Sequence, residues 1–230
     1  LVRGLVNGND TWWYVTGSKV NFCNTVASNA CGWWKITNGR VDFDFSGLAE
    51  NAYGWWKITN GQVDFSYVGY EQNGSNWWYV YGGQVCFQAT DVLPGTVGGQ
   101  YGWWKVCEGK VNFDDDVCEN AYGWWKITTG KVDFQYTGLA QNACGWWMIQ
   151  NGHVNFGSNG LVDNGNGWWL VKNGGVDFNY NGLVDNGNGW WLIRNGYVDF
   201  NYNGLVDNGN GWWLVKNGCV DFSYQGYVQN

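Results

Sequence analysis

The amino-acid sequence predicts an all-β repeat protein, a β-solenoid or superhelix of stacked β-hairpins with about ten repeats of roughly 22 residues. The first observation is a regular series of Trp-Trp doublets that contains all 20 tryptophans. The second is an Asn-Gly or similar turn after most doublets, between two runs of alternating polarity. The doublets begin at Trp12, Trp33, Trp55, Trp77, Trp103, Trp124, Trp146, Trp168, Trp190 and Trp212.

Residues 54–75 show how one repeat is expected to fold. Asn60-Gly61 is a strong hairpin signal, because a type I′ turn requires positive φ at both central residues. A two-residue turn also fixes the strand register. We therefore expect four facing pairs, which are Thr59–Gln62, Ile58–Val63, Lys57–Asp64 and Trp56–Phe65.

Successive side chains point to opposite faces of a strand, so the hairpin has an apolar face and a mixed face. The apolar face is predicted to form the core from the second Trp, two aliphatic residues and a Phe, as in Trp34, Ile36, Val41 and Phe43 or Trp169, Val171, Val176 and Phe178. The mixed face carries the first Trp and cross-strand ion pairs, namely Lys35–Asp42, Lys57–Asp64 and Lys126–Asp133. In later repeats Leu170, Leu192 and Leu214 replace the lysine.

Residues 1–230 are expected to form a single tandem array. An isolated hairpin is marginally stable in water, so each repeat must bury its apolar face against a neighbour. The connector of the type Gly138 to Gly145 is too rich in Gly and Asn for a helix, and its Leu can fill the space between layers. Partial repeats at both ends indicate a piece of a longer array, and an irregular insertion near residues 88–100, with Pro94, predicts a kink or a bulged loop.

Composition and charge exclude several classes of function. A net charge of −7 with 12 Lys and Arg leaves no basic stripe for nucleic acid. No apolar run reaches the length of a membrane-spanning helix, so membrane insertion is not expected. The acidic residues recur identically from repeat to repeat and the chain has one histidine, which argues against an enzyme and against a cofactor.

The Asp-Asn-Gly loops, the histidine and the cysteines are the candidates for metal sites and disulfides. The loop from Asp163 to Gly167 offers one carboxylate, and turn chemistry explains its Asn and Gly, so no metal site is expected. His153 occupies a turn-proximal slot and is interpreted as a solvated residue. Seven cysteines lack Cys-x-x-Cys spacing, and they are either scattered small apolar residues or include two disulfides within repeats, Cys23–Cys31 and Cys107–Cys118.

The repeat resembles the aromatic cell-wall-binding repeats of Gram-positive surface proteins, which include choline-binding and glucan-binding types. The resemblance rests on the Trp-Trp doublet, the Asn-Gly turn, the Lys-Val-Asp-Phe run and the following Gly-Leu-Ala-x-Asn, and it covers nearly the whole chain. The step Ser46-Gly47-Leu48 lacks the Trp that follows Gly in the family pattern. The resemblance implies a surface-anchoring or glycan-binding repeat at the extracellular face of a cell.

The predicted function is therefore a non-enzymatic binding module for cell-wall or glucan-type polysaccharide. The first indole of each doublet is the candidate ligand-binding residue, because a flat aromatic face stacks on a sugar ring; burial of both indoles in the core is the competing interpretation. A self-assembling fibre, stalk or adhesin is the alternative function. The candidate residues are Trp33, Trp55, Trp77, Trp103, Trp124, Trp146, Trp168, Trp190 and Trp212.

Overall fold

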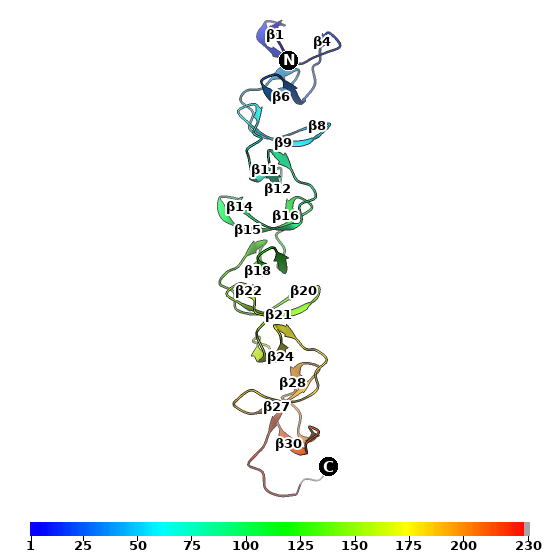
Figure 1. Ribbon diagram of the computed structural model, residues 1–230, viewed down its shortest axis with the longest axis vertical. Helices are drawn as coiled ribbons and strands as arrows, with labels where there is room; N and C mark the ends of the chain where they lie inside the picture. The colour runs from blue at the N-terminus through cyan, green and yellow to red at the C-terminus, as the bar shows by residue number, and fades with distance from the viewer. Residues whose placement is uncertain (228–230) are drawn as a thin grey trace. The chain divides into compact units, whose positions relative to one another are not determined.

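A computed structural model describes residues 1–227 and contains strands, turns and no helix in that range. The chain divides into two compact units. The first comprises Leu1–Asp114 with Thr129–Lys131, and the second comprises Asp115–Thr128 with the residues from Val132 onward. Figure 1 shows that both units are built from antiparallel β-hairpins, so the all-β repeat fold predicted from the sequence is confirmed.

Each repeat is a three-stranded antiparallel meander, one strand more than the predicted hairpin. The extra strand is the Gly-Leu connector, which pairs with the strand of the Trp doublet, as Ala49 does with Trp56. The first strands of the repeats are β1 (Val2–Val6), β5 (Thr25–Asn29), β8 (Gly47–Asn51), β11 (Gly69–Asn73), β14 (Asp91–Val97), β17 (Asp116–Asn120), β20 (Gly138–Asn142), β23 (Gly160–Asp163), β26 (Gly182–Asp185) and β29 (Gly204–Asp207).

The central strand of each repeat carries the Trp doublet. These strands are β2 (Asn9–Trp13), continued by β3 (Val15–Thr16), β6 (Gly32–Thr37), β9 (Gly54–Thr59), β12 (Asn76–Tyr81), β15 (Gln100–Cys107), β18 (Gly123–Thr128), β21 (Gly145–Gln150), β24 (Trp168–Lys172), β27 (Trp190–Arg194) and β30 (Trp212–Lys216).

The third strand of each repeat is only two residues long. These strands are β4 (Lys19–Val20), β7 (Arg40–Val41), β10 (Gln62–Val63), β13 (Gln84–Val85), β16 (Lys110–Val111), β19 (Lys131–Val132), β22 (His153–Val154), β25 (Gly175–Val176), β28 (Tyr197–Val198) and β31 (Cys219–Val220).

The turn between the central and third strands has the predicted geometry. Asn60 has φ +48° and Gly61 has φ +80°, as a type I′ turn requires. Gln62 faces Thr59 and Val63 faces Ile58, which confirms the predicted register next to the turn. The third strand ends at Val63 because the chain then bends away from the hairpin, although the Asp64 N–H still donates to the Lys57 carbonyl at 3.0 Å.

Neighbouring repeats are joined by a short set of backbone contacts that recurs within each unit. Gln62 of β10 forms a single bridge with Trp34 of the preceding repeat. The Lys35 N–H donates to the Gly61 carbonyl at 2.8 Å, and the Gly61 N–H donates to the Phe45 carbonyl at 2.8 Å. The Asn-Gly turn of one repeat is thereby held against the loop that follows the third strand of the preceding repeat.

The core contains the aliphatic residues of the predicted apolar face, but it differs from the prediction in two ways. Leu170 and Leu192, predicted on the mixed face, are each 3% exposed and belong to core clusters, and the phenylalanines lie outside the core. Ile36 is fully buried and Val41 is 7% exposed, but Phe43 is 46% exposed. Because the third strand ends before this residue, the Phe43 ring lies edge-on to Trp34, with the ring centroids 5.6 Å apart, instead of entering the core. The same departure recurs at Phe178, which is 40% exposed.

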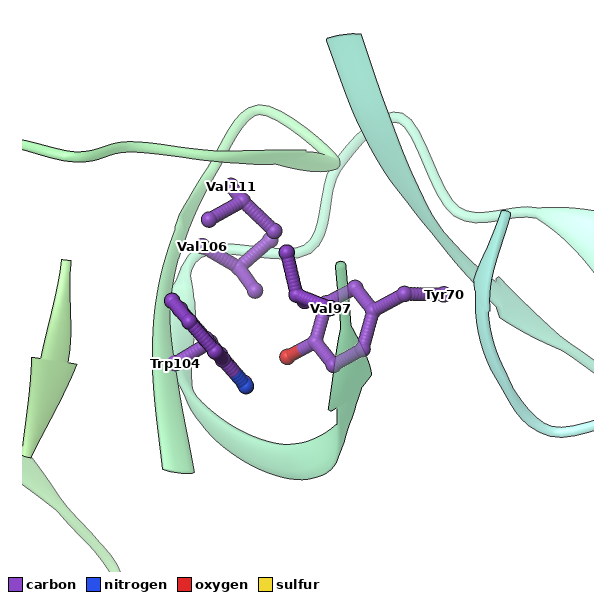
Figure 2. Close-up of a cluster of buried hydrophobic side chains, with 5 residues drawn as sticks. All are labelled: Tyr70, Val97, Trp104, Val106 and Val111. Atoms are coloured by element: carbon purple, nitrogen blue, oxygen red, sulfur yellow. The ribbon is translucent and has the colours of Figure 1, made fainter. Parts of the chain in front are cut away.

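The expected irregular loop near residues 88–100 is instead the longest regular hairpin in the chain. The four extra residues lengthen β14 to 7 residues and β15 to 8, whereas β8 and β9 have 5 and 6. Pro94 lies within β14, opposite Trp103. Figure 2 shows the core beside this hairpin, in which Tyr70 and Val97 pack with Trp104, Val106 and Val111. The prediction of a kink or bulge was wrong because the insertion adds equal lengths to two paired strands.

Candidate functional site

The two indoles of a doublet have different neighbours because they lie on opposite faces of the central strand. The second indole belongs to its own repeat, where Trp56 is 8% exposed and its ring lies edge-on to Phe65 with the centroids 5.8 Å apart. The first indole extends to the next repeat along the chain. The centroid of the Trp33 ring is 5.0 Å from that of Trp56 and 6.0 Å from that of Phe65.

This contact between a first indole and the second indole of the next repeat recurs along the chain. The ring planes become more nearly parallel toward the C-terminus, from 51° for Trp33 and Trp56 to 12° for Trp190 and Trp213. The centroid separations are 5.5 Å for Trp55–Trp78, 5.4 Å for Trp124–Trp147, 5.5 Å for Trp146–Trp169, 5.9 Å for Trp168–Trp191 and 6.4 Å for Trp190–Trp213.

An asparagine at the end of the first strand fixes the second indole. The Asn51 Oδ1 atom accepts hydrogen bonds from Trp56 Nε1 and from the Tyr53 backbone N–H, both at 2.9 Å. The Asn51 Nδ2 atom donates to the Val26 carbonyl of the preceding repeat at 3.1 Å. One side chain therefore orders the turn, the indole and the junction between two repeats.

These residues line an open groove of about 750 Å³ at the junction. Its aromatic wall is formed by Trp33, Tyr53 and Trp56, and Tyr53 is 76% exposed. Polar side chains complete the lining, namely Ser28, Asn51 and Gln84. We call this groove of Trp33, Tyr53, Trp56 and the three polar side chains the junction groove.

The nine predicted binding residues are not equally accessible. Trp190 is 36% exposed and Trp212 is 64% exposed, whereas the other seven are half-buried. Trp77 packs against the core cluster of Figure 2, and Trp103 lies opposite Pro94. The structure thus brings most of the first indoles to junctions between repeats, where they pack against the next second indole, and Trp33 also lines the groove.

Residues 3–21, 44–64, 66–86, 135–155, 157–177, 179–199 and 201–221 match the model of the choline-binding repeat. The chain belongs to the choline-binding repeat family. The sequence of this chain matches no curated protein.

Solved structures give weaker similarities. Choline-binding protein F from Streptococcus pneumoniae is 17% identical, with a TM-score of 0.35, over 80% of this chain and 61% of that one. CbpF in complex with ipratropium is 15% identical, with a TM-score of 0.34, over 83% and 71%. Alternansucrase in complex with isomaltononaose is 14% identical, with a TM-score of 0.31, over 96% of this chain and 17% of that one. The chain therefore spans less than two thirds of the first of these chains.

The lysines of these choline-binding repeats form different contacts from those predicted. The Lys57 Nζ atom lies 2.8 Å from Glu71 Oε1 of the next repeat and 5.4 Å from the Tyr67 ring centroid, so its ion pair is not with Asp64. Burial raises the pKa of the Tyr67 hydroxyl, and the negative charge of Glu71 adds to the effect. Lys126 likewise contacts Asp115, at 3.5 Å.

Repeats without this lysine keep a cation at the same tyrosine from another position. Where Leu170 replaces the lysine, the Lys172 Nζ atom lies 4.3 Å from the Tyr180 ring centroid and 2.9 Å from Asp177 Oδ2. In the next repeat Arg194 lies over Tyr202 at 4.5 Å. The aspartate after the third strand, such as Asp177, thus forms its ion pair with the residue just before the turn, Lys172. The predicted register had placed Asp177 opposite residue 170, two positions earlier in the central strand.

The last three repeats differ at the second indole. Trp169, Trp191 and Trp213 have buried Nε1 atoms without a hydrogen-bond partner among residues 1–227. Asn164 occupies the position of Asn51, and its Oδ1 atom accepts from the Asn166 N–H at 3.0 Å. However, Asp163 precedes it and accepts from the Gly165 N–H at 2.8 Å, whereas Glu50 stands at this position in the earlier repeat. In this repeat an additional turn, closed by the short Asp side chain, thus accompanies the loss of the bond to the indole.

The structure bears differently on the two predicted disulfides. Cys23 and Cys31 are free thiols on either side of β5, and an extended strand of that length keeps its ends about 13 Å apart, beyond the reach of a disulfide. Cys107 is also a free thiol, and its bridge to Cys118 stays a prediction.

Among residues 1–227 no group of three or more His, Cys, Asp and Glu side chains is placed to hold a metal ion. In the same range, no helix is long and apolar enough to cross a membrane.

Proposed function

We propose that the junction groove and the equivalent positions of the other repeats bind cell-wall or glucan-type polysaccharide, with one sugar ring stacked on the exposed part of a first indole. The observation that carries this proposal is the groove of Trp33, Tyr53 and Trp56, which combines an aromatic wall with polar side chains. Such a wall suits the C–H face of a sugar, and the polar rim suits its hydroxyl groups.

The ring spacing favours a sugar over a quaternary ammonium ion held between the rings. An ammonium ion enclosed by two facing rings needs space on the order of its own diameter between them. The Trp33 centroid is instead 5.0 Å from that of Trp56 and 6.0 Å from that of Phe65. At these separations the three rings are in contact with one another, and a ligand can approach only their outer faces.

Repetition then supplies the affinity. Each groove offers one stacking surface, and a polymer with regularly spaced sugars can occupy several grooves at once. Linked weak sites act at high effective concentration, so the array binds a polymer far more tightly than a monosaccharide. The proposal therefore predicts a steep increase in affinity with the length of the oligosaccharide.

Isothermal titration of the full chain with isomalto-oligosaccharides and teichoic-acid fragments of increasing length tests this function, with choline in a parallel titration. Trp190→Ala and Tyr53→Ala should each weaken binding. Tyr81→Ala is the matched control, because Tyr81 is 63% exposed but lies beside a hairpin turn, outside the groove lining. The proposal is wrong if choline binds and no saccharide does, or if Tyr81→Ala weakens binding as much as Tyr53→Ala.

A further inference from the structure

The outer face of the second indole is normally covered by the next repeat. From β7 onward, the first residue of the third strand forms the bridge to the preceding second Trp, and in several repeats its side chain lies on that indole. His153 covers Trp125 with the ring centroids 4.9 Å apart, and Tyr197 covers Trp169 at 4.9 Å. His153 is therefore not the solvated residue expected from the sequence. Lysine does the same elsewhere, with Nζ 5.7 Å from the Trp104 centroid for Lys131 and 5.5 Å from that of Trp78 for Lys110.

The covering side chains share a hydrogen-bond donor at the tip. Gln62 Nε2 donates to the Cys31 carbonyl at 3.3 Å, and Gln84 Nε2 donates to the Tyr53 carbonyl at 2.9 Å. The Tyr197 hydroxyl donates to the Asn166 carbonyl at 3.3 Å. In all three repeats the acceptor is the residue just before the glycine that precedes the Trp doublet. The slot above a second indole thus has an aromatic floor and a carbonyl acceptor.

Among residues 1–227, the bridge to Trp147 is formed by a residue that has no side chain to cover the indole. The residue that bridges to Trp147 is Gly175, and a Cβ atom there would lie 3.6 Å from the indole ring. A methyl group added at Gly32, Gly54, Gly102 or Gly123 would collide with the covering side chain, namely Gln62, Gln84, Lys131 or His153. At the equivalent Gly145, nothing lies within 4 Å of such a methyl group.

We infer that this vacancy, the Gly175 slot, is a binding site for a primary alkylammonium group, which lies on the Trp147 ring and donates to the Cys144 carbonyl. Two slots in the same chain are covered by a lysine, with Nζ 5.5 and 5.7 Å from the ring centroid, so an alkyl chain that ends in an ammonium fits above such a ring. The cation is attracted to the ring face, and its N–H groups match the carbonyl acceptor. A quaternary ammonium lacks that donor, so the slot selects primary amines.

The site does not depend on the proposed polysaccharide binding. The side chain of Asn142 holds the Trp147 indole through Oδ1 and Nε1 at 3.0 Å, so the floor of the slot is ordered without a ligand. Gly175 is not among the residues with positive φ, and larger side chains can therefore be placed there without backbone strain. Because of both features, the binding site can be tested by replacing Gly175 with a larger residue that fills the slot.

The indole N–H signals of the full chain in a ¹H–¹⁵N spectrum provide the test, with n-butylammonium as the probe. Trp34 is the internal control, because it has the same Asn contact, at 3.2 Å, but Gln62 covers its slot. Signals of Trp147 and Trp34 are assigned from Trp147→Phe and Trp34→Phe spectra. We expect a saturable shift at Trp147 and none at Trp34. Tetramethylammonium and n-butanol should bind at least about tenfold more weakly, because each lacks the donor or the charge.

Two reciprocal variants complete the experiment. Gly175→Gln, which copies Gln62, should abolish the response at Trp147, and Gln62→Gly should create a response at Trp34. The inference is overturned if Trp34 and Trp147 respond equally in the unmodified chain, if Gly175→Gln leaves the response intact, or if tetramethylammonium binds as well as n-butylammonium. Saccharide titrations of the same samples report on the proposed function separately, so the two can fail independently.

Discussion

The Oδ1 atom of Asn51 lies 2.9 Å from Nε1 of Trp56 and accepts its hydrogen bond. The same bond joins Asn29 to Trp34, Asn120 to Trp125 and Asn142 to Trp147. It links the end of the first strand of a repeat to the indole that packs against the preceding repeat. The stability of a junction therefore depends on a polar contact as well as on ring packing.

Asn51→Ala should lower the free energy of unfolding by about 2 to 3 kcal/mol, because it leaves the Trp56 indole and the Tyr53 N–H without an acceptor. Asn164→Ala is the matched variant, since Asn164 accepts from the Asn166 N–H but not from Trp169. It should lower that free energy by about 1 kcal/mol. Urea unfolding followed by tryptophan fluorescence measures both. Equal losses for the two variants would contradict the assigned role of the indole bond.

Asp163→Glu should restore the missing bond in a late repeat. Glutamate is too long for the turn that Asp163 makes with the Gly165 N–H, and Glu50 already stands at the equivalent position beside Asn51. The side-chain Oδ1 atom of Asn164 should then reach Nε1 of Trp169, and exchange of the proton on that nitrogen with solvent should slow. Hydrogen exchange by NMR measures this, with Asp44→Glu at an exposed site as the control. An unchanged Trp169 exchange rate rules out the turn as the cause.

Gly61→Ala should destabilise the chain more than Gly74→Ala. Both glycines have positive φ, +80° and +61°, so both substitutions strain the backbone by about 1 kcal/mol. A Cβ at Gly61 would also lie 2.5 Å from the Asp42 carbonyl oxygen of the preceding repeat, whereas one at Gly74 would meet nothing within 4 Å. Thermal unfolding by circular dichroism compares the two variants. Equal midpoints would show that the turn does not press on the preceding repeat.

Alkaline pH should destabilise the first unit through its buried tyrosine. Burial raises the pKa of Tyr70 well above its ordinary value, and the neighbouring Tyr79 and Asp91 add to the shift. A folded-state pKa above the unfolded one gives stability that is complete below the unfolded pKa of about 10 and is lost as the pH rises toward the folded pKa. Tyr70→Phe should reduce this dependence.

Tyr70→Phe also removes the 2.9 Å hydrogen bond from the Tyr70 hydroxyl to the Leu93 carbonyl. The variant should therefore be less stable than the unmodified chain at neutral pH. Urea midpoints at pH 7 and above pH 10 separate the two effects. Parallel pH profiles for the two proteins would show that Tyr70 is not the group that titrates.

The hairpin could be predicted from the sequence because its determinants are local. Asn60-Gly61 fixes the turn, and the turn fixes the pairing of Ile58 with Val63. The connector was not recognised as a strand, because its Gly, Ala and Asn have low β propensity and its pairing depends on the central strand. The partner of Lys57 was missed for a related reason, since Glu71 belongs to the next repeat.

The candidate site was predictable only in part. Periodicity distinguished the first indole from the second, and the structure places them on opposite faces of the strand. It could not show that Trp33 would contact Trp56, because that contact depends on how two hairpins meet. The vacancy at Gly175 was equally hidden, since a glycine in a two-residue strand has no distinctive sequence signal until the partner Trp147 is known.

The bridge between Gln62 and Trp34 connects residues of adjacent repeats, and the bridge between Gln84 and Trp56 in the next repeat has the same offset along the chain. Removing one full repeat length, such as residues 48–69, would bring equivalent residues of the flanking repeats into the same relation. Removing half that length would place a turn where a strand must pair. Duplication or loss of whole repeats in the gene is therefore structurally neutral, and array length can change by recombination without a new fold having to evolve.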